Sequence, residues 1–196
     1  MLHIVETDVV IVGAGAAGTF AALHAAKQNP KLRITVLDKS KMETSGAAGR
    51  GMDALNTMAL PPNSTTEDVV EMLTKISEGI IDQDVAFAFG KRCPDVVREL
   101  EEIMGRKKGD LFPVDENGNY RLWYLHPVNK PLLLPMHGEE MKRALAKAVR
   151  DTGAKVYDRT PAIKLTTEDG RISRFINGKN LTAIRTLYLI HNKFLL

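Results

Sequence analysis

The sequence predicts an α/β fold built around a parallel sheet. Residues 8–12 are a short apolar run that stops at Gly13, which is typical of a strand buried on both faces. An alanine-rich stretch over 16–28 predicts a helix that packs closely on a sheet, and Asn29-Pro30 ends it because proline cannot continue a helix. A second apolar run over 32–37 completes a strand–helix–strand (βαβ) unit of about 30 residues.

The middle of the chain predicts an inserted segment before the sheet resumes. Residues 42–63 are rich in Gly, Ala, Ser and Pro and predict an extended loop. Helices are expected over 66–78 and 83–104. Ser64 and Glu67 have the spacing of a capping box for the first helix.

Two further signals divide this inserted segment. Pro94 is expected to split the helical stretch over 83–104 into two pieces, with Pro94 in the first turn of the later piece. Asn117-Gly118 is a hairpin signal, followed by alternation at Tyr120, Leu122 and Tyr124.

The sheet is expected to resume after a helix over 139–151. The apolar residues of this helix predict its buried side, namely Met141, Leu145, Ala148 and Val149. Strands are expected near 154–165, and Asp169-Gly170 predicts another hairpin turn.

Composition and charge exclude several classes of protein. One cysteine, Cys93, excludes a disulfide framework and a Cys-rich metal site, and it favours a reducing, cytoplasmic compartment. No apolar run approaches the ~20 residues of a membrane span, and the first residues do not predict a signal peptide. All 24 acidic residues lie before Gly170, whereas the last 26 residues carry five basic residues and no acid. The basic charge therefore belongs to a short tail, which argues against a nucleic-acid face.

A glycine motif follows the first predicted strand directly. Its residues have the GxGxxG spacing: Gly13, Ala14, Gly15, Ala16, Ala17 and Gly18. Glycine permits the tight turn and the close approach of a pyrophosphate, and the helix N-terminus offers free N–H groups to the phosphates. Asp38 lies 20 residues beyond Gly18, at the end of the second strand, where a carboxylate accepts hydrogen bonds from ribose hydroxyls and repels a 2′-phosphate. This pattern predicts a Rossmann-like dinucleotide site and leaves FAD and NAD open.

The next segment resembles a known family. Lys39-Ser40 and the run from Ser45 to Asn56 are similar to the second flavin-contact segment of the succinate dehydrogenase/fumarate reductase flavoprotein family, nearest to adenylylsulfate reductase alpha subunits and soluble fumarate-reductase-like proteins. The resemblance implies an FAD-binding domain and an oxidoreductase. It implies further cofactor contacts at Lys39, Ser45, Gly46, Ala47, Gly49, Gly51 and Met52. Membrane-bound members carry a histidine that bonds to the flavin at the position of Ser45, so we expect non-covalent FAD here.

The resemblance assigns no catalytic residue, because the family's substrate-orienting groups lie mostly in a capping domain outside the similar region. His126 and His137 are interpreted as loop histidines rather than proton donors, and Cys93 as a structural thiol. Arg50 is either a charge near the flavin or a solvated loop residue. No metal site is expected.

The similarity divides the chain into a partial FAD-binding domain over 1–172 and a basic tail over 173–196. A truncated or frame-shifted reading frame explains this division and predicts an incomplete FAD/NAD(P)-binding domain. The alternatives are a short chain completed by a second chain in a split flavoprotein, a non-catalytic nucleotide-binding module and an NAD-binding domain. An electron-transfer subunit is a further possible partner.

Overall fold

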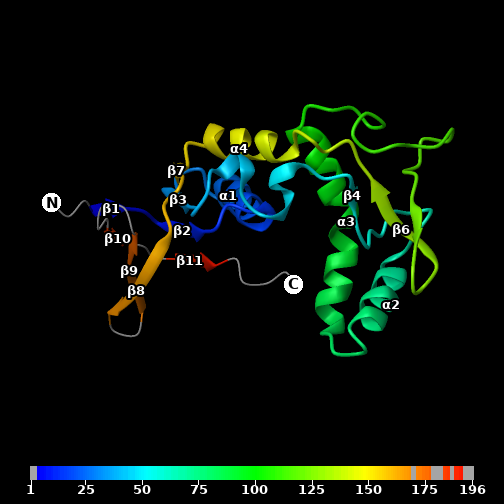
Figure 1. Cartoon of the computed structure of the whole chain (residues 1–196), viewed down its shortest axis with the longest axis horizontal. Coiled ribbons are helices and arrows are strands. Elements are labelled where there is room, and N and C mark those ends of the chain that lie inside the picture. The colour runs from blue at the N-terminus through cyan, green and yellow to red at the C-terminus, as the bar shows by residue number, and fades with distance from the viewer. Residues whose placement is uncertain (1–3, 169–170, 178–182, 186–187, 192–196) are drawn as a thin grey trace. The chain divides into compact units, whose positions relative to one another are not determined.

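The computed structural model describes residues 4–168, 171–177, 183–185 and 188–191. The chain divides into two compact units (Figure 1). Unit 1 comprises Met1–Gly51 and Glu140–Leu196, and unit 2 is the inserted segment Met52–Glu139. The two ends of unit 2 are hydrogen-bonded to each other, since Met52 N donates to Gly138 O (3.2 Å) and Gly138 N donates to Met52 O (3.0 Å).

In unit 2, helix α2 (Thr66–Ile76) begins in a capping box, one residue later than predicted. Thr65 Oγ1 accepts from Asp68 N (3.2 Å), and the Asp68 carboxylate accepts from Thr65 N (2.8 Å). The predicted pair of Ser64 and Glu67 is wrong. Ser64 is buried, and its hydroxyl closes the preceding loop by hydrogen bonds to the backbone.

Helix α3 (Gln83–Ile103) is continuous, so the predicted break at Pro94 is wrong. Proline removes one hydrogen bond of the helix, the bond to the Gly90 carbonyl. The buried side chains lie on both sides of Pro94, namely Ala86, Gly90, Cys93, Val97, Leu100 and Glu101. Their packing outweighs the loss of one backbone hydrogen bond.

The Asn117-Gly118 signal is confirmed as a turn but not as a hairpin of regular strands. Gly118 has a φ of 78°, and only an isolated antiparallel bridge between Val114 and Tyr120 flanks it. Regular pairing lies in an antiparallel sheet with the strand order β4 (Ala54–Leu55), β6 (Lys130–Pro135) and β5 (Trp123–Leu125). Of the alternating residues after the turn, Tyr120 therefore bridges to Val114 before the turn, whereas Tyr124 pairs with Pro131 of β6.

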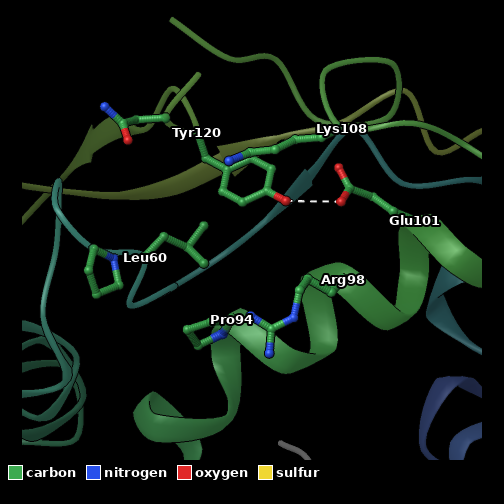
Figure 2. Close-up of a pocket in the computed structure, with 8 residues that line it drawn as sticks. Leu60, Pro94, Arg98, Glu101, Lys108 and Tyr120 are labelled. Carbon is green, nitrogen blue, oxygen red and sulfur yellow. Dashed lines mark hydrogen bonds between the residues drawn. The ribbon is translucent and has the colours of Figure 1, made fainter. Parts of the chain in front are cut away.

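A pocket of about 390 Å³ in unit 2 has a polar wall made by Tyr120 and Glu101 (Figure 2). Tyr120 Oη donates to Glu101 Oε2 (2.9 Å). Glu101 is only 7% exposed, and its other oxygen has no hydrogen-bond partner among the described residues. Burial and the hydrogen bond to Glu101 raise the pKa of Tyr120. The remaining lining residues are Leu60, Pro61, Pro94, Arg98, Lys108 and Asn119.

Unit 1 contains the predicted parallel sheet. Its strands, all parallel, have the order β11 (Tyr188–His191), β2 (Val9–Val12), β3 (Ile34–Leu37) and β7 (Lys155–Tyr157). Helix α1 (Ala16–Gln28) connects β2 to β3 and ends where Asn29-Pro30 predicts. The α/β class and the βαβ start are thereby confirmed, although β3 begins two residues later than expected.

Four further strands form a second sheet in unit 1. Their order is β1 (Ile4–Glu6), β10 (Ala183–Arg185), β9 (Arg171–Asn177) and β8 (Ala162–Glu168). Glu168 of β8 pairs with Arg171 of β9, and the predicted turn Asp169-Gly170 between them lies outside the described residues. The expected tail over 173–196 therefore supplies backbone to both sheets of unit 1.

Alternation along the strands separates the two faces of the parallel sheet. Val9 and Ile11 of β2 and the facing residues of β3 pack with α1 and with α4 (Met141–Asp151), in a cluster that includes Ala22, Ala146 and Val149. Val10 and Leu37 point to the other face and pack with Val5 and Ala162. Both faces are covered, which explains why β2 and β3 are continuous apolar runs.

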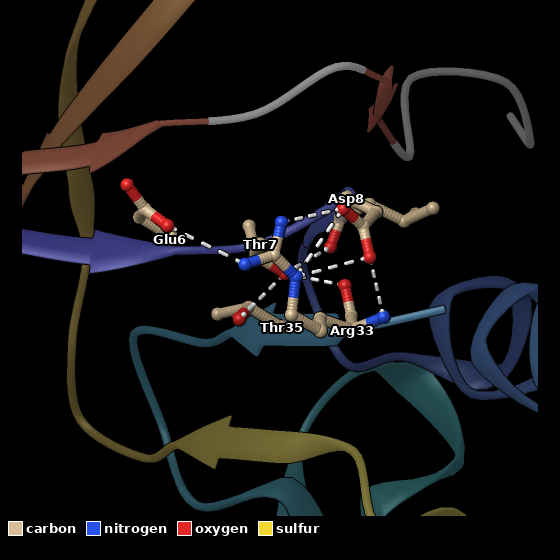
Figure 3. Close-up of polar contacts among 6 residues, drawn as sticks. Glu6, Thr7, Asp8, Arg33 and Thr35 are labelled. Carbon is tan, nitrogen blue, oxygen red and sulfur yellow. Dashed lines mark hydrogen bonds and ion pairs between the residues drawn. The ribbon is translucent and has the colours of Figure 1, made fainter. Parts of the chain in front are cut away.

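Polar contacts fix the entrance of β3 beside the entrance of β2 (Figure 3). Arg33 Nη2 pairs with Asp8 Oδ1 (2.7 Å), and this guanidinium lowers the pKa of Asp8 to about 2. Thr7 is buried, donates to Arg33 O (2.6 Å) and accepts from the hydroxyl of Thr35 (3.1 Å). These contacts help to define the register of Val9 opposite Ile34.

We expect Tyr120→Phe to lower the free energy of unfolding of unit 2 by about 2 kcal/mol, because it removes the donor from a buried carboxylate. Tyr124→Phe is the matched control, since Tyr124 is 67% exposed. Urea unfolding followed by circular dichroism measures both variants. Equal stability of the two variants would contradict the assigned hydrogen bond.

Candidate functional site

The GxGxxG residues 13–18, here called the glycine loop, connect the end of β2 to the start of α1. Gly13 N donates to Leu37 O (2.8 Å), which holds the loop against the end of β3. Gly18 lies so close to Gly13 that a Cβ atom on Gly18 would be 1.8 Å from the Gly13 carbonyl oxygen. Only glycine fits at position 18, and this close approach brings the first turn of α1 against the strand end.

The first turn of α1 presents unpaired N–H groups. The N-cap residue, Gly15, has no side chain to cap the helix, and the first backbone bond runs from Thr19 N to Gly15 O (3.0 Å). Within the described part of the chain, no acceptor binds the N–H groups of Gly15, Ala16 and Ala17. Such N–H groups at a helix N-terminus bind phosphate.

Asp38 follows β3 and connects the glycine loop to that strand. It is 5% exposed, and its Oδ2 accepts from Ala14 N (2.5 Å) and from Ser45 Oγ (2.6 Å). Oδ1 accepts from Ser40 N (2.6 Å). A carboxylate oxygen has two lone pairs, so Oδ1 retains acceptor capacity for a ribose hydroxyl.

Residues 158–160 hold the segment after Asp38 in place. Thr160 N donates to Asp38 O (2.6 Å), and Arg159 N donates to Ser40 O (2.9 Å). Asp158 Oδ1 accepts from Met42 N (2.7 Å). No local pattern predicts this role, because the two segments are far apart along the chain and are brought together by β3–β7 pairing.

The segment 45–51 lies directly against the glycine loop. Gly46 has a φ of 77°, and a Cβ atom on Gly46 would be 2.9 Å from Gly15 Cα. The short 3-10 helices η1 (Met42–Thr44) and η2 (Ala47–Arg50) flank Gly46, and a Cβ atom on Gly49 would be 2.1 Å from Thr44 O. The backbone of this segment is therefore compact and close to the loop, and this packing requires glycine at positions 46 and 49.

Lys142, in the first turn of α4, is a residue of this site that the sequence analysis missed. Its side chain is 1% exposed, and Nζ donates to the Ala14 carbonyl of the glycine loop. Burial lowers the pKa of Lys142 to about 8, against the opposing effects of Asp38 and Glu43. Helical spacing was the available signal, since Lys142 shares a face with Leu145, Ala146 and Val149. The structure buries Ala146 on this face, whereas Ala148, which was expected there, is only half-buried.

The glycine loop, Asp38, Ser45 and Gly46 form one cluster in unit 1, and Ala47, Gly49 and Gly51 follow in η2 and at its end. Lys39 is exposed, and Met52 is the first residue of unit 2.

The other residues considered for chemistry are either exposed or buried as structural groups. Arg50, His126 and His137 are exposed. Cys93 is buried, and burial raises the pKa of its thiol, as expected for a structural cysteine. Among the described residues, no group of three or more His, Cys, Asp or Glu side chains could hold a metal ion, and no helix is long and apolar enough to cross a membrane.

Comparison with known proteins agrees with this geometry. Residues 8–186 match the protein family described as FAD binding domain. L-aspartate oxidase of Streptomyces coelicolor is 29% identical over 174 residues, which are 85% of this chain and 28% of that protein. Adenylylsulfate reductase subunit alpha of Megalodesulfovibrio gigas is 31% identical over 101 residues, which are 50% of this chain and 15% of that protein.

Solved structures show the same fold. A structure of E. coli quinol fumarate reductase superposes with a TM-score of 0.81 at 20% identity, over 97% of this chain and 33% of that chain. An adenosine-5-phosphosulfate reductase in complex with sulfite gives a TM-score of 0.73 at 21% identity, over 97% of this chain and 30% of that chain. The 196 residues thus correspond to a third or less of each of these relatives.

Proposed function

We propose, from the premise that this chain belongs to the FAD binding domain family, that it holds FAD non-covalently as part of an oxidoreductase of the fumarate reductase, succinate dehydrogenase or adenylylsulfate reductase type. The observation that carries the proposal is the cluster of the glycine loop, Asp38 and Gly46 in unit 1. The free N–H groups fit a pyrophosphate, and the adjoining carboxylate fits a ribose.

Each part of the cofactor would have its own protein partners. The N–H groups of Gly15, Ala16 and Ala17 would bind the pyrophosphate, and Asp38 would accept from the adenosine ribose. The segment 45–52 would lie along the flavin edge, because its glycines allow the backbone to approach without side chains. Lys39 would be a further cofactor contact. When bound, FAD supplies the hydride-transfer chemistry.

Ser45 supports non-covalent binding. Its hydroxyl is engaged with Asp38 and is not a nucleophile of the kind that a flavin-linking histidine provides. The segment 45–52 contains no histidine. We therefore expect the protein to release unmodified flavin when it unfolds.

Residues outside these 196 would form the substrate site. About two thirds or more of each relative named above has no counterpart in these 196 residues. A second chain that completes a split flavoprotein would supply a closed site, and an electron-transfer subunit would be a further partner. The boundary at residue 172 and the cytoplasmic location remain predictions.

FAD binding tests the proposal directly. We expect the purified protein to bind FAD, measured by quenching of flavin fluorescence, more tightly than NAD. Acid precipitation should release all flavin into the supernatant, because no covalent bond holds it. A protein that binds NAD and not FAD would favour the NAD-binding alternative, and flavin retained in the acid pellet would contradict non-covalent attachment.

Gly46→Ala tests the contact between the segment 45–51 and the glycine loop. The added Cβ atom would be 2.9 Å from Gly15 Cα, so we expect FAD affinity to fall by about tenfold or more, which is at least ~1.4 kcal/mol. Gly153→Ala is the matched control in unit 1, since Gly153 also has a positive φ (83°) but no neighbour within 4 Å. Equal FAD affinity of the two variants would show that the contact with Gly15 does not contribute to binding.

Turnover tests the expectation that these residues lack a complete active site. Catalysis requires substrate positioned in a closed site with a proton donor. We expect no turnover of fumarate, succinate, aspartate or adenylylsulfate by the 196-residue chain with FAD and a redox dye. Steady turnover of any of the four substrates, at a rate typical of enzymes, would overturn this expectation.

A further inference from the structure

Lys142 is a buried cation without a matching anion in contact. The residue is 1% exposed, and its ammonium group donates to one neutral acceptor, the carbonyl oxygen of Ala14. No carboxylate in the described part of the chain lies within ion-pair distance of it. A buried charge with only one neutral partner is costly, so its presence under the glycine loop calls for a compensating interaction.

The charged groups around Lys142 do not neutralise it by contact. The elements packed on α4 are α1, η1 and η2. Asp38 and Glu43 act on Lys142 only through space, and Glu43 is itself paired with Arg150 (3.0 Å). The other titratable groups of these three elements are His24 and Lys27 in the last turns of α1 and the exposed Arg50 of η2.

The hydrogen bond from Lys142 determines which way one peptide group of the loop faces. In a trans peptide, the carbonyl oxygen and the following N–H point in opposite directions. Because Lys142 holds the Ala14 carbonyl inward, the Gly15 N–H points away from the protein interior. Asp38 holds the preceding peptide through Ala14 N, so the loop is held from both α4 and β3.

We propose that Lys142 is a positioning residue for the cofactor pyrophosphate, holding the Ala14–Gly15 peptide so that Gly15 N–H faces the phosphates and placing a positive charge beneath them. This inference rests on dinucleotide binding at the glycine loop but not on the identity of the dinucleotide. The pyrophosphate dianion is the anion that the buried ammonium lacks.

The pH dependence of binding follows from this placement. The pKa of Lys142 is about 8 in the free protein, and a nearby dianion raises it. The protein therefore binds the phosphates more tightly when Lys142 is protonated. Its affinity for them falls as the pH rises through the pKa that Lys142 has in the free protein. Between pH 7 and pH 9 the expected loss is about five- to tenfold.

The experiment compares ADP-ribose, which contains the pyrophosphate, with adenosine, which does not. Calorimetric titration of the unaltered protein at pH 7 to 9 should show a falling affinity for ADP-ribose and a constant affinity for adenosine. ADP is the part common to FAD and NAD, and ADP-ribose carries its two phosphates in the doubly esterified form of both dinucleotides. Failure of the FAD proposal therefore leaves this test intact. Identical pH profiles for the two ligands would overturn the role of Lys142.

Variants of α4 assign the effect to one residue. Lys142→Met should weaken ADP-ribose binding about tenfold or more at pH 7 and remove the pH dependence. Lys147→Met is the matched control, because Lys147 lies on the same helix with 77% of its side chain exposed, and it should retain the profile of the unaltered protein. A Lys142→Met protein that keeps the original affinity and pH profile would refute the proposal. If Lys142→Met does not fold, the comparison of ADP-ribose with adenosine in the unaltered protein decides the question.

Discussion

The direction of the peptide groups in the glycine loop is the constraint on which the candidate site depends. Two side chains of opposite charge set it, with Asp38 accepting from Ala14 N and Lys142 donating to Ala14 O. Both side chains reach the loop only because the parallel sheet places the end of β3 beside the end of β2 and α4 beside α1. The fold therefore orients the Ala14–Gly15 peptide, and this orientation sets the direction of the N–H groups in the first turn of α1.

Local pattern was sufficient to predict the βαβ unit and the glycine loop. Apolar runs, small residues and Asn29-Pro30 act over a few residues, and each is decided by backbone sterics or burial. The position of Asp38 could also be predicted, since the strand before it ends at a fixed distance from the loop. What the structure adds is its set of partners, Ala14, Ser40 and Ser45.

The wrong predictions at Pro94 and after Asn117-Gly118 share a physical cause, which is packing between residues distant in the sequence. Proline disfavours a helix locally, but buried side chains on both sides of Pro94 keep α3 continuous. The hairpin signal at Asn117-Gly118 gave a turn, whereas β6 determined the pairing of the strand after it. Lys142 was overlooked because a lysine on an apolar helix face is ordinarily solvated, and only the carbonyl of Ala14 explains its burial.

A loop held by buried charged groups links folding to binding. Burial of the Lys142 ammonium opposes folding, since this group is more basic in the unfolded chain than its pKa of about 8 in the folded protein. A ligand that binds only the folded state offsets such a cost in proportion to RT ln(1 + [L]/Kd). An anionic cofactor at the loop would favour the protonated amine and the folded unit together. Lys142 would then oppose folding without the cofactor and stabilise the folded protein with it.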